Sequence, residues 1–214
     1  MSTLNLALNN PDPSVRLNAA LGAGMNPSMA DLNLLLHRCA VEPDFQVLEM
    51  LTWALIRLPA SAVVPELIGE LSSQKTQARR QALHTLSKFR DVSAWKAVAA
   101  RLDDVDPEVV RAAWYAAVAI VPDGHRDWLA EKLASNLGQG SEEWQLSLSR
   151  ALVALGGDII EPVLDAACRR GDNRVREHAV ATKKLLNDAN AAFVLSLKRA
   201  RKEVALGKTR SAKG

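Results

Sequence analysis

Apolar residues recur along this chain with a helical period, inside a longer period of about 31 residues. In each repeat, mostly small or apolar residues stand at an anchor position and again 4, 7 and 11 positions later, which places them on one face of an α-helix. The spacings between successive anchors are 32, 31, 31, 35 and 31 residues. The anchors are Val15, Val47, Ala78, Val109, Trp144 and Val175. A fixed period of this length predicts a helical repeat protein with six repeats.

The residue types at equivalent positions support this alignment. Position 4 after the anchor holds Ala19, Leu51, Ala82, Ala113, Leu148 and Ala179, and position 7 holds Gly22, Ala54, Thr85, Ala116, Ala151 and Thr182. The second column is uniformly small, as close packing of neighbouring helices requires. We therefore expect Ala54, Ala82, Ala113, Ala116 and Ala151 to be buried where helices cross.

Each anchored helix is expected to be the second helix, or B helix, of a pair. The first helices, or A helices, are predicted at residues 3–8, 28–41, 62–71, 93–102, 125–137 and 159–169. With 4% aromatic residues and no strand pattern, the chain is predicted to be all-α: a right-handed α-solenoid of about six antiparallel helix pairs over residues 1–188. An amphipathic basic helix is expected at 189–206, followed by a disordered tail at 207–214.

One motif in these repeats resembles a known family. The pattern DP-x-VR-x-x-A occurs at Asp12, Pro13, Val15, Arg16 and Ala19, and returns in part around Asp106 and Asp172. It is similar to the HEAT-like repeats of the bilin-lyase type. The resemblance implies a solenoid fold, which hosts many unrelated functions.

The repeated arginines have a structural interpretation. Arg16, Arg79 and Arg176 each directly follow an anchor. In a solenoid of the type that the chain resembles, such arginines commonly bond to loop aspartates of adjacent repeats, so we expect Asp12 and Asp172 to be their partners.

Net charge is unevenly distributed along the chain. The total is +3, but seven basic residues and one acid follow from Lys198 onward, so this segment carries +6 and the rest about −3. Four of these cations, Lys198, Arg199, Arg201 and Lys202, face away from the apolar stripe of the predicted C-terminal helix. This helix is interpreted as a cap on the last repeat; an arm that binds nucleic acid or a membrane surface is the alternative.

The sequence offers little for catalysis. Its four histidines, His37, His84, His125 and His178, fall in different repeats without the spacing of metal ligands. Cys39 and Cys168 are expected to be free thiols. We predict a non-enzyme without metal or cofactor. The start of the chain lacks a signal-peptide pattern, and no apolar run could span a bilayer, so a cytoplasmic location is expected.

A binding surface is predicted on the B helices, opposite the anchored stripe. Positions 2 and 6 after the anchors lie there and would line the concave face of a solenoid. They hold Trp53, His84, Tyr115 and Arg150 at position 6, and Glu49, Arg80 and Arg111 at position 2. Aromatic residues and arginines together are typical of binding sites. We therefore predict an adaptor for a protein or peptide of acidic character. One alternative is that neighbouring helices cover Trp53 and Tyr115. The other is a nucleic-acid-binding protein, including one with a groove like that of HEAT-like DNA glycosylases.

Overall fold

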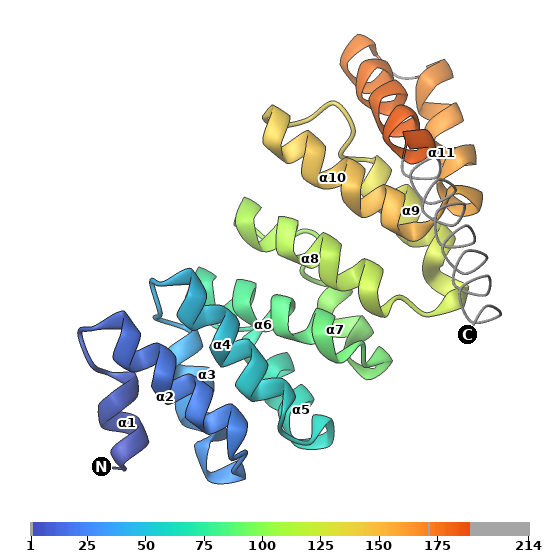
Figure 1. The fold of residues 1–214 in the computed structure, drawn as a ribbon. Helices are drawn as coiled ribbons and strands as arrows, with labels where there is room; N and C mark the ends of the chain where they lie inside the picture. Colours follow the sequence, from blue (N-terminus) through green and yellow to red (C-terminus); the bar gives the residue numbers. More distant parts are fainter. Residues whose placement is uncertain (1, 171, 189–214) are drawn as a thin grey trace, which may run out of the picture. The chain divides into compact units, whose positions relative to one another are not determined.

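A computed structural model describes residues 2–170 and 172–188, and these fold into helices and short connections (Figure 1). The chain divides into two compact units, Met1–His125 and Arg126–Gly214. The predicted helix at 189–206, the tail at 207–214 and the basic residues Lys198, Arg199, Arg201 and Lys202 lie outside the described residues.

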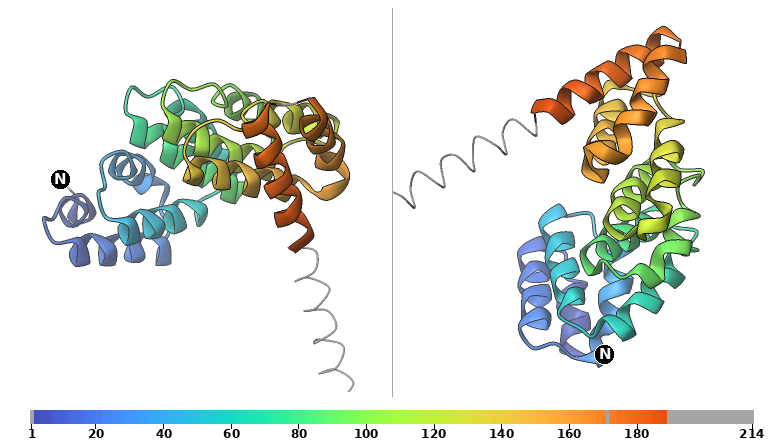
Figure 2. Two further views of the ribbon diagram at one scale, coloured as in Figure 1. Left: turned by 90° about the horizontal axis from the view of Figure 1, so that it is seen from above. Right: turned by 90° about the vertical axis from the view of Figure 1, so that its right-hand side faces the viewer.

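In the first unit, four helix pairs follow one another. They are α1 (Thr3–Leu8) with α2 (Pro13–Met25), α3 (Leu32–Cys39) with α4 (Phe45–Ile56), α5 (Ala60–Glu70) with α6 (Thr76–Phe89), and α7 (Trp95–Ala99) with α8 (Pro107–Ile120). The second unit contains α9 (Arg126–Ala134), α10 (Glu142–Leu155), α11 (Gly157–Arg170) and a helical segment over 173–188. The all-α prediction and the pairing of A and B helices are confirmed (Figures 1 and 2).

Short 3-10 turns lead into three of the A helices. They are η1 (Met29–Asp31), η2 (Val92–Ala94) and η3 (Asp123–His125), before α3, α7 and α9. These three A helices are therefore shorter than predicted, whereas α1 has the predicted bounds and α5 and α11 are slightly longer. Among the described residues, no helix is both long and apolar enough to cross a membrane.

Aspartates of the DP motif start the B helices. The Asp12 side chain accepts a hydrogen bond from the Ser14 amide at 2.8 Å, and Asp106 accepts one from the Glu108 amide at 2.9 Å. Each aspartate satisfies an amide that has no partner inside the helix, and the proline that follows it fits the first helical turn. This part of the motif is therefore explained by helix capping.

The five alanines predicted at helix crossings are all buried. The B helices bury more than the predicted stripe, because positions 1, 5 and 8 after the anchor also face a neighbour. In α4, for example, Val47, Leu51 and Ala54 form the predicted flank, and Leu48 and Thr52 form a second buried flank beside it. A B helix between two others is thus covered on both sides.

End helices show which flank faces which neighbour. Helix α2 has a B-helix neighbour, α4, on one side; there Ala20 and Ala23 are buried, but Val15 is 36% exposed. In the helix over 173–188 the pattern is reversed, since Ala179 is buried and Val180 is 59% exposed. Positions 1, 5 and 8 therefore face the following repeat. The prediction that the anchor of the first repeat is buried was wrong, because no described B helix covers that flank.

Two of the arginines form buried ion pairs, but with acids other than those predicted. Arg16 donates two hydrogen bonds to Glu42, at 2.8 and 2.7 Å, and Arg79 donates two to Asp104, at 3.1 and 2.9 Å. Each pair connects a B helix to the loop before the next B helix.

The aspartates predicted as partners, Asp12 and Asp172, instead accept hydrogen bonds from amides at the start of their own helices. Arg176 donates to Asn173 in the same turn. Asp12 and Asp172 were therefore the wrong partners, because each lies at the start of the arginine's own helix, while the arginine faces the following repeat.

Hydrogen bonds around Glu42 hold it ionised inside the protein. Burial by itself would raise the pKa of this carboxyl, but hydrogen bonds from Arg16, the Asp44 amide and Arg38 outweigh burial and lower the pKa to about 2. The Asp104 pKa is lowered in the same way, by the Asp106 amide and Arg79 against the effect of burial. These carboxylates are structural elements of the repeat.

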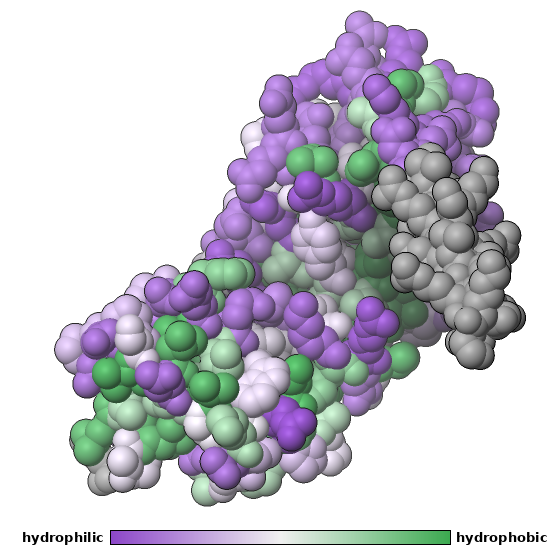
Figure 3. Space-filling view, viewed as in Figure 1, coloured by the Kyte–Doolittle hydropathy of each residue, from purple (hydrophilic) through white to green (hydrophobic). Residues whose placement is uncertain are grey.

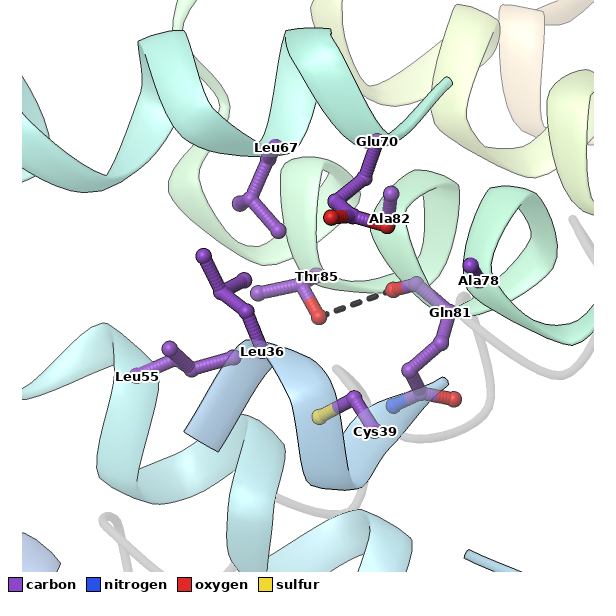
Figure 4. A pocket seen from close by; sticks show the side chains of 9 residues that line it. All are labelled: Leu36, Cys39, Leu55, Leu67, Glu70, Ala78, Gln81, Ala82 and Thr85. Carbon is purple, nitrogen blue, oxygen red and sulfur yellow. Dashed lines mark hydrogen bonds between the residues drawn. The ribbon is translucent and has the colours of Figure 1, made fainter. Parts of the chain in front are cut away.

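The core of the first unit is closely packed. Nine side chains from α3, α4, α5 and α6 surround a space of about 10 Å³ (Figure 4), which holds at most one water molecule. Cys39 is one of them, and burial raises the pKa of its thiol to about 12. This thiol is therefore not a nucleophile at neutral pH.

Candidate functional site

Six of the predicted site residues lie in the first unit, on three successive B helices. Glu49 and Trp53 are on α4, Arg80 and His84 on α6, and Arg111 and Tyr115 on α8. None of these six side chains is fully buried, and Tyr115 is 41% exposed. Arg150 is exposed on α10, in the second unit. The helical register predicted for this face is therefore that of the structure.

Trp53 is the most constrained aromatic residue of this face. A methyl group placed at Gly24 of α2 would come within 2.1 Å of the Trp53 ring. The ring thus packs directly over the backbone of the preceding B helix, and Trp53 is only partly accessible. A neighbouring helix therefore partly covers Trp53, as in the alternative interpretation of this face. Tyr115, in contrast, is 41% exposed.

Two adjoining hollows form a groove on the same face. The first has a volume of about 360 Å³ and lies between the starts of α4, α6 and α8, with Phe45 at its edge. The second, of about 450 Å³, lies toward the ends of α6 and α8. Both are lined by His84, Ala112 and Tyr115. Figure 3 shows apolar and polar residues side by side over the first unit, as expected for a surface that contacts a partner.

Charged residues of opposite sign line the first hollow. Glu108 lies 3.1 Å from Arg111 and 3.9 Å from Arg80, measured between carboxylate oxygens and guanidinium nitrogens. On the other side of the hollow, Glu49 lies 3.2 Å from the His84 ring. Burial lowers the pKa of His84, and the charges of Lys88 and Arg80 lower it further against the opposing effect of Glu49.

Sequence reasoning missed three side chains of this groove. Phe45, the first residue of α4, is 73% exposed, while Lys88 and Arg90 line the second hollow. Phe45 lies before the anchor, and Lys88 and Arg90 lie 10 and 12 positions after the anchor Ala78, so none of them stands at position 2 or 6. The exposed aromatic residue directly after the cap Asp44 was the available signal.

The second unit has a separate hollow of about 390 Å³ over α10 and the helix at 173–188. His178 lines it and is hydrogen-bonded on both ring nitrogens: the Gly138 amide donates to Nδ1 at 3.1 Å, and Nε2 lies 3.0 Å from the Gln145 carbonyl. This arrangement requires a neutral ring with its proton on Nε2. Burial lowers the His178 pKa, consistent with the neutral form.

The groove exposes aromatic and charged side chains of α4, α6 and α8. Within residues 2–170 and 172–188, no group of three His, Cys, Asp or Glu side chains is placed to hold a metal ion. What the groove presents is one exposed phenylalanine, one tyrosine and several cations at a solvent-accessible surface. These groups can contact apolar and acidic parts of another molecule.

The chain is therefore a helical repeat protein of paired α-helices with a groove on its B helices. Residues 32–119, which include every residue that lines the groove, match the family of HEAT repeats. None of the curated proteins compared with this chain matches its sequence significantly.

Several solved structures similar to this chain are designed or engineered proteins. An engineered protein from a structural genomics consortium shares 16% identity, covers 88% of this chain and 100% of its own, and has a TM-score of 0.47. A designed armadillo repeat protein shares 16% identity over 86% of this chain and 98% of its own, with a TM-score of 0.44. Another, solved in complex with the peptide (KR)4, shares 15% identity over the same fractions, with a TM-score of 0.48.

Proposed function

We propose that this protein is a non-enzymatic adaptor that binds an extended peptide segment of a partner protein in the groove of its first unit. The groove itself supports this proposal: two continuous hollows on one face, with Phe45 and Tyr115 exposed beside them. Exposed aromatic side chains next to cations are characteristic of protein interfaces. The cytoplasm is the compartment we propose for this interaction.

The motif shared with bilin-lyase-type repeats gives no reason to propose lyase chemistry. Asp12 and Asp106 cap helices, and Arg16 is committed to a buried ion pair with Glu42. These residues serve the fold, and our proposal therefore rests on the groove side chains. The alternative of a nucleic-acid-binding protein has two bases: the basic residues from Lys198 onward, which lie outside the described part of the chain, and a groove like that of HEAT-like DNA glycosylases.

Peptide selection followed by binding measurements tests the proposal. Peptides are selected from a random display library on the full-length protein, synthesised with a fluorescein label, and titrated by fluorescence anisotropy. Tyr115→Ala should weaken binding about fivefold or more, because it removes an exposed aromatic contact worth about 1–3 kcal/mol. The melting temperature of this variant should stay close to that of the wild type.

Trp128 provides a matched control. It is 46% exposed, close to the value for Tyr115, but lies on α9 in the second unit. Trp128→Ala should leave peptide affinity within twofold of the wild type. If no peptide is selected, or if both variants weaken binding equally, the groove is not the binding site.

A further inference from the structure

The two ends of the groove differ in charge. In the first hollow, acids oppose the cations: Glu108 contacts both Arg80 and Arg111, and Glu49 lies beside His84. These arginines were expected to supply the positive charge for an acidic partner. Because their charges are already partly compensated, this end of the groove is a poor place for another anion.

The second hollow is positively charged. Lys88 and Arg90 line it, no Asp or Glu is among its lining residues, and neither cation forms an ion pair within the described part of the chain. The effect of Lys88 reaches His84, whose pKa it lowers together with burial and Arg80. A positive potential therefore covers the end of α6.

The backbone at Arg90 supports a role for its side chain. Arg90 ends α6 in the left-handed conformation, with φ = 53°, and among the described residues it is the one non-glycine residue with positive φ. Glycine is the usual residue at this position, because a side chain makes the conformation less favourable. An arginine here places a cation at the edge of the hollow at some cost in backbone energy.

We propose that the second hollow is the anion subsite of the groove, where Lys88 and Arg90 bind an Asp or Glu side chain of the partner peptide while Phe45 and Tyr115 contact an apolar residue of the same peptide. This proposal rests on the peptide-binding function proposed above and names the chemistry of its ligand.

Helix geometry sets the spacing of the two recognised residues. Arg80 at the first hollow and Lys88 at the second are eight residues apart on α6, about 12 Å along the helix axis. An extended peptide advances about 3.3 Å per residue. Peptide groups that lie beside Arg80 and beside Lys88 should therefore be about four positions apart.

The charge distribution favours a peptide over a nucleic acid. A nucleic acid carries a negative charge at every phosphate, so a strand that follows the whole groove would meet Glu49 and Glu108 at the first hollow. A peptide with one acidic end avoids this repulsion. The groove thus fits a ligand whose charge is local.

The test uses labelled peptides selected on the wild-type full-length chain. Lys88→Glu and Arg90→Glu should each weaken binding tenfold or more, and Lys96→Glu, a matched reversal at an exposed lysine on α7, should change it less than twofold. Replacing the acidic peptide residue by glutamine should weaken binding to the wild type. The same replacement should have little effect on binding to Lys88→Gln, because the charge partner is then already absent.

The remaining outcomes distinguish failure of the anion subsite from failure of the proposed function and of the ligand class. If Tyr115→Ala abolishes binding but the Lys88 and Arg90 variants bind like the wild type, the anion subsite is wrong and the groove remains. If no peptide binds, the proposed function fails together with the subsite. A single-stranded oligonucleotide that displaces the peptide would overturn the choice of ligand class. Because both cations are exposed, their variants should melt like the wild type, and Lys88→Gln and Arg90→Gln replace any reversal that does not.

Discussion

Glutamine in place of Glu42 would remove the negative charge that Arg16 and Arg38 share inside the first unit. The Glu42 side chain is inaccessible to solvent, and its pKa is lowered from 4.5 to about 2. At about 1.36 kcal/mol per pKa unit, this shift corresponds to roughly 3 kcal/mol of stability at neutral pH. Breaking a buried ion pair by removing one partner costs about 3–5 kcal/mol, which agrees in size.

The pH dependence gives a second and independent readout. Since the folded state lowers this carboxyl's pKa, its contribution is fully present above about pH 4.5 and is lost as pH falls toward 2. The difference in unfolding free energy between wild type and Glu42→Gln should therefore be about 3 kcal/mol at pH 7 and about 1.4 kcal/mol at pH 3. Urea unfolding at several pH values measures this difference, and hydrogen exchange localises it to α2 and α4.

Glu108→Gln is the control, because Glu108 is also paired with arginine but is exposed. An exposed pair is worth about 0–1 kcal/mol. A Glu42→Gln effect no larger than that of the control, or one that does not shrink on acidification, would refute the assignment of Glu42 as a stabilising buried anion.

Three further predictions concern packing and protonation. Gly24→Ala should destabilise the protein by about 1–3 kcal/mol and change its tryptophan fluorescence, because the added methyl group meets the Trp53 ring. Gly22→Ala is the control: no atom lies within 4 Å of the added methyl group, so this variant should be neutral or slightly stabilising. Ala116→Leu should destabilise by about 1–3 kcal/mol, and a melting temperature equal to the wild type would contradict its position at a helix crossing. The second unit should lose stability as pH falls below about 6.5, because the pKa of His178 is lowered in the fold and protonation breaks its bond from the Gly138 amide; a His178→Gln variant should lose this pH dependence in hydrogen exchange.

Much of the fold could be predicted because repeats average out local ambiguity. Ala54 or Ala116 alone would say little, but small residues at the same position of six repeats define a packed face. The method fails at the ends of the array. Val15 has the residue type of a buried anchor, but its exposure depends on a neighbour that the repeat pattern cannot report.

The acids that pair with the buried arginines occupy a regular position in the sequence. Glu42 and Asp104 each lie two residues before the capping aspartate of the next B helix, 26 and 25 residues after their arginines. The periodic pattern led instead to the prediction of the capping aspartates Asp12 and Asp172 as partners. Of the residues at position 6, His84 and Tyr115 line the groove, but the cationic end of the groove was not predicted, because Lys88 and Arg90 lie where α6 stops and the periodicity ends.

Buried ion pairs join the first repeat to the second and the third to the fourth, but the second and third lack one. Where Arg16 and Arg79 stand in their repeats, the second repeat has Leu48, and the α4–α6 contact is smaller than those of α2–α4 and α6–α8. In mechanical terms, the first unit consists of two blocks, each tied internally by a buried ion pair, and the joint between them is held by neutral hydrogen bonds from Gln77 to the Cys39 and Glu42 carbonyls and from Gln81 to Thr52. Phe45 belongs to one block and Tyr115 to the other, so bending at this joint would change the width of the groove without altering the packing inside either block.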